Sequence, residues 1–144
     1  MTGNAETLAN EAHKRAESAG HTASLLNLAD VKPAQLTAMK TALFIVSTWG
    51  DGEPPDDAAE FWYKLESAEL DLTGLNYAVL GLGDKDYADF NGFARQLDER
   101  LTKLGATQLT IRADADLDFE DTFVEWSERV LTVLATRQVA ATAS

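Results

Sequence analysis

The stretch that decides the fold is TALFIVSTWGDGEPP, residues 41–55. Its first part is a short apolar run, residues 42–46, which predicts a buried strand. A loop with two glycines and Trp49 follows, and a patterned helix comes after it. In an α/β sheet, ligands bind at the carboxyl ends of strands. Glycine lets the backbone approach a flat ring closely, and tryptophan offers a broad π face for stacking. The stretch therefore indicates a site for a planar cofactor.

Length and composition restrict the classes of protein that this chain can be. Its 144 residues suffice for one domain with one core. Hydrophobic residues make up 45% and charged residues 25%, an ordinary soluble balance. No apolar stretch approaches the roughly 18 residues of a membrane span, and the polar N-terminus has no signal-peptide pattern. Because the sequence has no cysteine, disulfides, thiolate catalysis and cysteine-ligated metal centres are excluded. We expect a cytoplasmic protein.

The charge of the chain is strongly acidic, with a formal net charge of −12. Nucleic acids and anionic membranes require a basic face, so neither is an expected partner. An acidic surface suits docking to a partner protein with a basic face, because opposite charges accelerate encounter at low salt. A surface that is acidic only for solubility is an equally good interpretation.

Helices and strands alternate along the chain. Helices are expected at 3–19, from 55, at 92–104 and at 119–135; strands at 21–28, 41–47, 77–82 and 108–113; a connection at 30–39; and an acidic loop at 114–118. This alternation predicts a parallel sheet between two layers of helices. We assign residues 1–135 to the domain and interpret residues 136–144, which are small and polar, as a flexible tail or linker remnant.

Residues 2–6, TGNAE, look like the loop between a strand and a helix. Exposed backbone N–H groups at a helix start form an anion site without any basic side chain. An ordinary helix start capped by Thr2 is the other interpretation. A loop of this kind normally follows a strand, and that strand would lie before Met1.

Three segments together carry a resemblance to a known family. Residues 2–6 resemble the phosphate loop of flavodoxin-like domains, residues 47–55 resemble their second flavin loop, and residues 82–91, LGDKDYADFN, resemble the third. The combination is most similar to the FMN domain of the diflavin reductases, especially the sulfite reductase flavoprotein. The resemblance covers residues 2–135, and its strength lies in three ordered motifs at compatible spacing.

The resemblance implies a flavodoxin-like three-layer sandwich whose parallel sheet has the order 2-1-3-4-5. Strand 1, which is central in that order, is absent from this chain. Its loss would remove on the order of 10 kcal/mol of apolar burial, and whole domains are stable by only about 5–15 kcal/mol. We therefore expect that the chain is an N-terminally truncated domain. The alternative is that strand 2 moves across and pairs with strand 3.

The resemblance also implies the cofactor, FMN, and a set of residues that bind it. The Thr2 hydroxyl and the N–H groups of residues 3–6 would bind the phosphate, Trp49 and Tyr87 would stack on the isoalloxazine ring, the Gly50 peptide would turn its carbonyl toward the flavin, and Asp114 would tune the redox potential. The full expected set is Thr2, Gly3, Asn4, Ala5, Glu6, Ser47, Thr48, Trp49, Gly50, Asp51, Gly52, Leu82, Gly83, Asp84, Tyr87, Phe90, Asn91 and Asp114.

Simpler interpretations remain for several of these residues. Trp49 and Tyr87 could belong to the core, although both lie in glycine- or aspartate-rich loops; Trp62 and Trp126, on apolar helix faces, are expected in the core. Gly50 could serve only a tight turn. Asp114 could belong to a solvated acidic loop.

Other chemistries fit the sequence poorly. Asp114, Asp116 and Asp118 with Glu125 match the acidic positions of a calcium loop, but Phe119 stands where that loop requires glycine. The sequence has no G-x-S-x-G motif, no third glycine of a dinucleotide fingerprint and no pair of histidines at metal-ligand spacing. We therefore assign neither catalytic residues nor a metal site.

The resulting functional prediction is an FMN-binding electron-transfer domain. It would relay electrons one at a time from an FAD/NADPH reductase domain or protein to a redox acceptor with a basic docking face. It would act as an electron carrier and not as a self-sufficient reductase. The alternative is a degenerate flavodoxin-like interaction module that no longer binds flavin and uses its acidic face.

Overall fold

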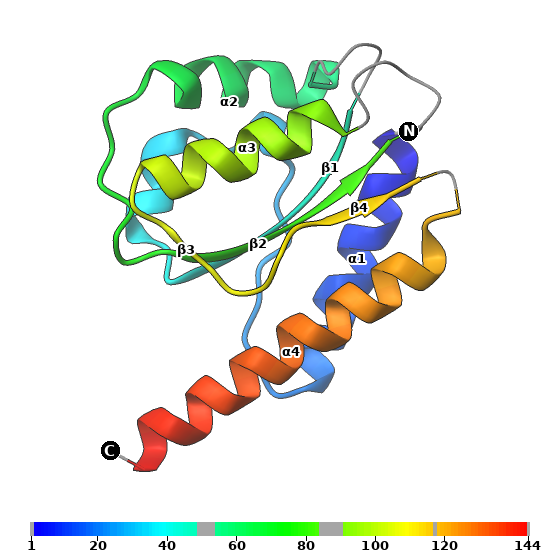
Figure 1. The fold of residues 1–144 in the computed structure, drawn as a ribbon, viewed down its shortest axis with the longest axis vertical. Helices are drawn as coiled ribbons and strands as arrows, with labels where there is room; N and C mark the ends of the chain where they lie inside the picture. Colours follow the sequence, from blue (N-terminus) through cyan, green and yellow to red (C-terminus); the bar gives the residue numbers. More distant parts are fainter. Residues whose placement is uncertain (1, 49–53, 84–90, 117, 144) are drawn as a thin grey trace.

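The computed structural model describes residues 2–48, 54–83, 91–116 and 118–143. Figure 1 shows helices on both faces of one sheet. The elements are α1 (Thr2–Ser18), the 3-10 helices η1 (Leu28–Asp30) and η2 (Pro33–Ala38), β1 (Thr41–Ser47), α2 (Asp56–Ser67), β2 (Asn76–Leu82), α3 (Gly92–Lys103), β3 (Thr107–Gln108), β4 (Ala113–Ala115) and α4 (Glu120–Ala143).

All described strands run parallel, and β2 stands between the others. β1 pairs with β2 along its whole length, from Thr41 opposite Asn76 to Ser47 opposite Leu82. On its other side β2 pairs first with β3 and then with β4. α1 and α4 cover one face of the sheet, and α2 and α3 cover the other (Figure 1). The predicted three-layer α/β sandwich is confirmed.

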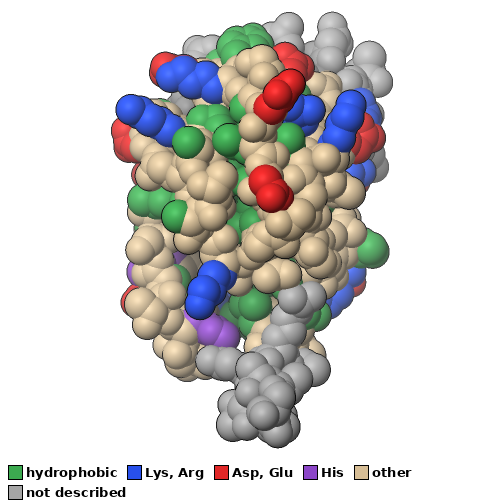
Figure 2. Space-filling view, turned by 90° about the vertical axis from the view of Figure 1, so that its left-hand side faces the viewer, with side chains coloured by type: hydrophobic (Ala, Val, Ile, Leu, Met, Phe, Trp, Pro, Cys, Tyr) green, Lys and Arg blue, Asp and Glu red, His purple; other side chains and the backbone are tan. Residues whose placement is uncertain are grey.

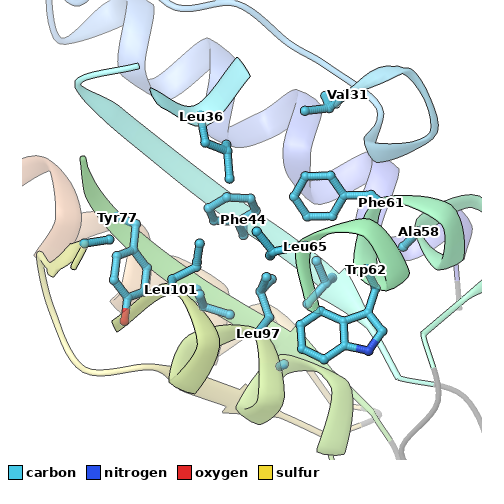
Figure 3. Close-up of a cluster of buried hydrophobic side chains, with 14 of the residues drawn as sticks. Val31, Leu36, Phe44, Ala58, Phe61, Trp62, Leu65, Tyr77, Leu97 and Leu101 are labelled. Atoms are coloured by element: carbon cyan, nitrogen blue, oxygen red, sulfur yellow. The ribbon is translucent and has the colours of Figure 1, made fainter. Parts of the chain in front are cut away.

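The core consists of one hydrophobic cluster on each face of the sheet. Figure 3 shows the first, in which Phe44 lies near Phe61 of α2, and Tyr77 lies near Leu101 of α3 at the other end of the cluster. The second lies between the sheet and the helices α1 and α4, around Trp126. Consecutive residues of β2 alternate between the two clusters, which explains why its sequence is continuously apolar. Trp62 and Trp126 are buried as predicted.

Two glycines end helices as the sequence predicts. Gly20 follows α1 with φ of 93°, and Gly105 follows α3 with φ of 103°. These angles lie in the left-handed region, which costs glycine little because it has no Cβ.

Three expectations from the sequence are corrected. Residues 21–28, expected as a strand, are irregular up to η1, because among the described residues no strand lies on that side of β1 to supply a ladder. The alternative in which this segment pairs with the strand at 41–47 is likewise wrong. The strand expected at 108–113 is divided into β3 and β4.

The described sheet accounts for one part of the expected strand order. In the expected order 2-1-3-4-5, β1 takes the place of strand 3, β2 that of strand 4, and β3 and β4 together that of strand 5. The described residues form no strand at the places of strands 1 and 2. α4 continues as a helix to Ala143, beyond its expected end at residue 135. None of the helices in the described ranges combines the length and apolar character that a membrane crossing requires.

Candidate functional site

The candidate site lies at the carboxyl edge of the sheet, where the topology brings separated segments together. β1 ends at Ser47 and β2 at Leu82, and the parallel register places these two residues side by side. α1 and α3 both begin at this edge (Figure 1). The edge therefore collects helix N-termini and strand ends, which is where α/β sheets bind ligands.

Thr48 joins three elements at this edge. Its backbone N–H donates to the carbonyl of Leu82 over 3.0 Å, which extends the ladder between β1 and β2 by one residue. Its Oγ1 accepts a hydrogen bond from the backbone N–H of Phe93 over 3.2 Å. This N–H lies in the first turn of α3, where helix geometry leaves donors without intrahelical partners. The hydroxyl of Thr48 thus caps α3, and Thr48 is buried.

Asn91 is the most constrained polar residue of the site. It has left-handed backbone angles, φ 53° and ψ 33°, and only 1% of its surface is exposed. Its Nδ2 donates to the carbonyls of Gly81 and Ala115 over 3.3 and 3.5 Å. Its Oδ1 is buried without a hydrogen-bond partner among the described residues. Asparagine tolerates the left-handed region better than most residues. The backbone of Asn91 can therefore lead into α3 while its side chain connects β2 to β4.

The packing of Asn91 explains two glycines. A Cβ at Gly81 would lie 2.6 Å from the Cβ of Ala94, and a Cβ at Gly83 would overlap Oδ1 of Asn91. The N–H of Gly83 donates to the carbonyl of Ala115 over 2.9 Å, so the chain stays in the ladder at this point. Glycine at position 81 therefore leaves room for Ala94, and glycine at position 83, one of the expected FMN-binding residues, leaves room for Asn91.

Residues 2–6, expected as a loop before a helix, form the first turn of α1. Asn4 and Glu6 are exposed, whereas Ala5 packs against the second core cluster, which includes Leu82 and Ala115. The start of α1 therefore lies next to the ends of β2 and β4. The first N–H groups of an α-helix have no intrahelical partners and carry a partial positive charge.

Asp114 lies on β4 and not in a loop, and it has a cationic partner. Arg112 Nε lies 3.0 Å from Asp114 Oδ1, and Arg112 Nη1 lies 3.0 Å from Oδ2 of the buried Asp98. The hydroxyl of Tyr77 donates to Asp98 Oδ1 over 2.5 Å. Burial and this hydrogen bond raise the pKa of Tyr77 above its ordinary value. The charge of Asp114 is therefore largely compensated, which the sequence did not indicate.

The remaining expected site residues are not part of the description. Seven of the expected residues lie outside the described ones: Trp49, Gly50, Asp51, Gly52, Asp84, Tyr87 and Phe90. Their roles therefore stay predictions. Within the described ranges, no group of three or more histidine, aspartate or glutamate side chains is arranged to hold a metal ion.

The chain is similar to known proteins over most of its length. The flavodoxin family model matches residues 1–126. The sulfite reductase [NADPH] flavoprotein alpha-component of Bacillus subtilis is 40% identical over 132 residues, which are 91% of this chain and 22% of that protein. The NADPH–cytochrome P450 reductase of Musca domestica is 46% identical over 90 residues, 61% of this chain and 13% of that protein.

Solved structures agree with these sequence relatives. A flavodoxin from Streptococcus pneumoniae TIGR4 superimposes with a TM-score of 0.83 at 28% identity, and the match covers 95% of this chain and 93% of that one. In contrast, this chain spans only 22% of the sulfite reductase component. The comparison thus matches the chain to whole flavodoxins and to one part of the larger reductases.

Proposed function

The chain belongs to the flavodoxin family, whose members bind FMN and transfer electrons, and we propose that it relays electrons one at a time between a flavin reductase and an acceptor. FMN would bind at the carboxyl edge of the sheet. The flavin supplies the redox chemistry, because its ring system accepts and releases electrons, while the protein supplies binding, orientation and electrostatics.

One observation supports the proposed place of binding above the others. Thr48, Gly83 and Asn91 come from three separate segments, and hydrogen bonds through Leu82, Phe93 and Ala115 connect them at one edge of the sheet. Asn91 presents a buried oxygen that has no partner among the described residues. A buried acceptor without a partner is unfavourable, so a ligand with hydrogen-bond donors fits this edge.

The first turn of α1 is the proposed phosphate site. N–H groups at a helix N-terminus bind anions without basic side chains, and the first basic residue of α1 is Lys14, several turns into the helix. Trp49 and Tyr87 would stack on the two faces of the ring and exclude water from it. Because Asp114 is paired with Arg112, it would repel a negative charge on the reduced flavin less strongly than an unpaired carboxylate would.

The partners are proposed from charge and from the relatives. The net charge of −12 suits an acceptor with a basic docking face. Two relatives are named as reductases that use NADPH, which supports an FAD/NADPH reductase domain or protein as the electron donor. We propose a cytoplasmic carrier whose flavin-binding unit is residues 1–135, with residues 136–144 as an appendage.

Titration with FMN tests the proposal. Flavin fluorescence should be quenched on binding, because stacked aromatic side chains quench excited flavin. Trp49→Ala should weaken FMN affinity by about 1–3 kcal/mol, by analogy with stacking of bases on aromatic side chains. Tyr63→Ala is the matched control, because Tyr63 is an exposed aromatic on α2, and it should leave the affinity unchanged.

Two outcomes would contradict the proposal. Equal affinities of wild type and Trp49→Ala would show that Trp49 does not contact the ring. If no quenching occurs, either for the chain alone or after an apolar strand is fused before Met1, the chain is an interaction module and not a flavin carrier.

A further inference from the structure

The first turn of α3 contains an N–H group whose acceptor comes from another element. Asn91, which precedes α3, makes no side-chain hydrogen bond to the helix, because its Nδ2 donates to the carbonyls of Gly81 and Ala115. The N–H of Phe93 donates to Oγ1 of Thr48 over 3.2 Å. A helix cap usually comes from the residue just before the helix. Here the cap is a tertiary contact between the end of β1 and the start of α3.

Both groups of this contact are shielded from water. Phe93 has no exposed surface, and Thr48 exposes only 4% of its surface. A buried N–H group that loses its acceptor is unfavourable, because water cannot take the place of the acceptor. If the hydroxyl of Thr48 is removed, the local structure therefore changes until the N–H of Phe93 finds another partner or reaches solvent.

The α3 side of the contact is fixed more firmly than the β1 side. Phe93 and Leu101 of α3 are fully buried, and the ring of Phe93 packs edge-on against Trp62 of α2 with a centroid distance of 5.5 Å. Thr48 follows the last residue of β1, and its backbone N–H is attached to the carbonyl of Leu82 in β2. Loss of the hydroxyl should thus displace the end of β1 and not the body of α3.

We propose that Thr48 is a positioning residue for the flavin ring, which acts through α3 and does not touch FMN with its side chain. The inference rests on the proposed function, in which the next residue, Trp49, stacks on the ring. Bonds to Leu82 and Phe93 hold Thr48 at two points, so the chain leaves β1 from a fixed place. A preassembled ring site binds more tightly, because less has to be ordered when the ligand binds.

A positioning role and a direct contact predict different dependence on the ligand. FMN and riboflavin have the same ring system, and only FMN carries a phosphate. If Thr48 positions the ring site, loss of its hydroxyl should weaken the binding of both ligands by the same factor. If the hydroxyl bound the phosphate, only the binding of FMN would be weakened. The proposed phosphate site is the first turn of α1, which is a different element from β1 and α3.

Fluorescence titration of Thr48→Val with FMN and with riboflavin tests the inference. Valine keeps the shape of threonine but has no hydroxyl group to accept a hydrogen bond. Both dissociation constants should rise by about three- to tenfold, the size expected for one lost hydrogen bond, and their ratio should stay that of wild type. Thr48→Ser keeps the hydroxyl and should restore most of the affinity. Thr48→Ala, which lacks it and is smaller than valine, should behave as Thr48→Val does.

Thr102→Val is the matched control, because it makes the same substitution in a hydroxyl contact near the other end of α3. Oγ1 of Thr102 lies 2.6 Å from the hydroxyl of Tyr77, about 14 Å along the helix axis from Phe93. α3 ends at the side of the molecule that faces the viewer in Figure 2, where charged side chains of both signs lie among hydrophobic ones. This variant should lose some stability and keep the wild-type dissociation constants for both ligands.

Amide hydrogen exchange on the chain without flavin measures the contact itself. Exchange at Phe93, relative to exchange at Leu101, should be about tenfold faster in Thr48→Val than in wild type, because exchange reports local opening of hydrogen bonds. In Thr48→Ser this ratio should stay close to that of wild type. This measurement requires no bound ligand, so it is independent of the proposed function.

Three results would overturn the inference and leave the proposed function intact. The first is wild-type affinity of Thr48→Val for both ligands, which would limit the hydroxyl to a role in stability. The second is weaker binding of FMN with unchanged binding of riboflavin, which would place the hydroxyl at the phosphate. The third is unchanged relative exchange at Phe93 in Thr48→Val. If wild type binds neither ligand, the proposed function fails, and this inference fails with it.

Discussion

β1 and β2 are neighbouring strands with similar apolar sequences and different surroundings. β2 has strands on both sides, and each residue from Tyr77 to Leu82 is buried. β1 has a described strand on one side only, and Leu43 and Ile45 remain half-buried. The burial of an apolar strand therefore depends on its neighbours as much as on its own sequence. The side of the molecule around β2 forms a closed half, and the side with β1 and residues 20–28 forms an open half.

The largest expected difference between the two halves is in the free energy of unfolding that is lost when a leucine is replaced by alanine. Leu80 in β2 is 0% exposed, whereas Leu26 in the open half is 54% exposed. Leu80→Ala should lower the free energy of unfolding by about 2–5 kcal/mol, because it leaves a cavity in the core. Leu26→Ala should change it by about 0.5 kcal/mol or less, as surface substitutions do. Urea unfolding of the two variants measures both values, and equal losses would contradict the division into halves.

A pair of glycines gives the next largest effect. Gly81→Ala places a methyl group 2.6 Å from the Cβ of Ala94 and should destabilise the protein by about 1–3 kcal/mol through overpacking. At Gly74, in the connection before β2, a Cβ meets no atom within 4 Å. Gly74→Ala should be neutral or stabilise by up to about 1 kcal/mol, because it restricts the unfolded chain. If thermal unfolding shows both variants equally stable, the packing of Asn91 against the end of β2 is looser than described.

The hydroxyl of Tyr77 gives a smaller effect that depends on pH. Tyr77→Phe removes hydrogen bonds to Asp98 and Thr102 and should destabilise by about 0.5–1.5 kcal/mol at neutral pH. The pKa of Tyr77 is raised in the folded protein by burial, then by the hydrogen bond with Asp98. Below about pH 10 the tyrosine is protonated in both states, so its contribution is fully present.

Above about pH 10 this contribution declines, because the unfolded state releases the proton first. Wild type should therefore lose stability more steeply than Tyr77→Phe as the pH rises from about 10 toward the folded pKa. Chemical unfolding of both proteins at pH 8, about 10 and about 11 measures the two slopes. Parallel slopes would show that Tyr77 is already accessible to solvent in the folded state.

The smallest expected effect is that of removing residues 136–144. Among the residues of α4 whose burial is described, which end at Ala135, Val130 is the last fully buried apolar one, and Val133 and Leu134 pack partly against the core. Deletion after Ala135 should change the free energy of unfolding by about 0.5 kcal/mol, similar to a surface substitution. A loss comparable to that of Leu80→Ala would place the domain boundary farther toward the C-terminus.

The sequence predicted the layers because they follow from local patterns. Apolar runs at 41–47 and 77–82 predicted β1 and β2, and Gly20 and Gly105 correctly predicted helix ends. It failed at residues 21–28, because a weakly alternating segment becomes a strand only when a neighbour completes its ladder. Whether that neighbour exists is a property of the tertiary structure.

The site was predictable in its place but not in its internal connections. Ser47, Thr48, Leu82, Gly83 and Asn91 lie at one edge of the sheet, as the parallel order requires. The pairing of Asp114 with Arg112 joins residues only two apart, but the strand β4 on which Asp114 lies was not predicted, because residues 114–118 were expected as a loop. That Gly81 and Gly83 accommodate Asn91 and Ala94 follows from contacts across α3 and β2, which no local pattern encodes.

FMN binding at the carboxyl edge is tested most directly by amide chemical shifts of the isotope-labelled chain during titration with FMN. We predict saturable shifts with one FMN per chain at Thr48, Gly83 and Asn91 and in the first turn of α1, while Leu25, Leu26 and the odd-numbered residues of β1 stay unchanged. Two results would contradict the account. One is shifts confined to Leu25, Leu26 and the odd-numbered residues of β1, and the other is no shift at FMN concentrations at which the protein quenches the flavin fluorescence.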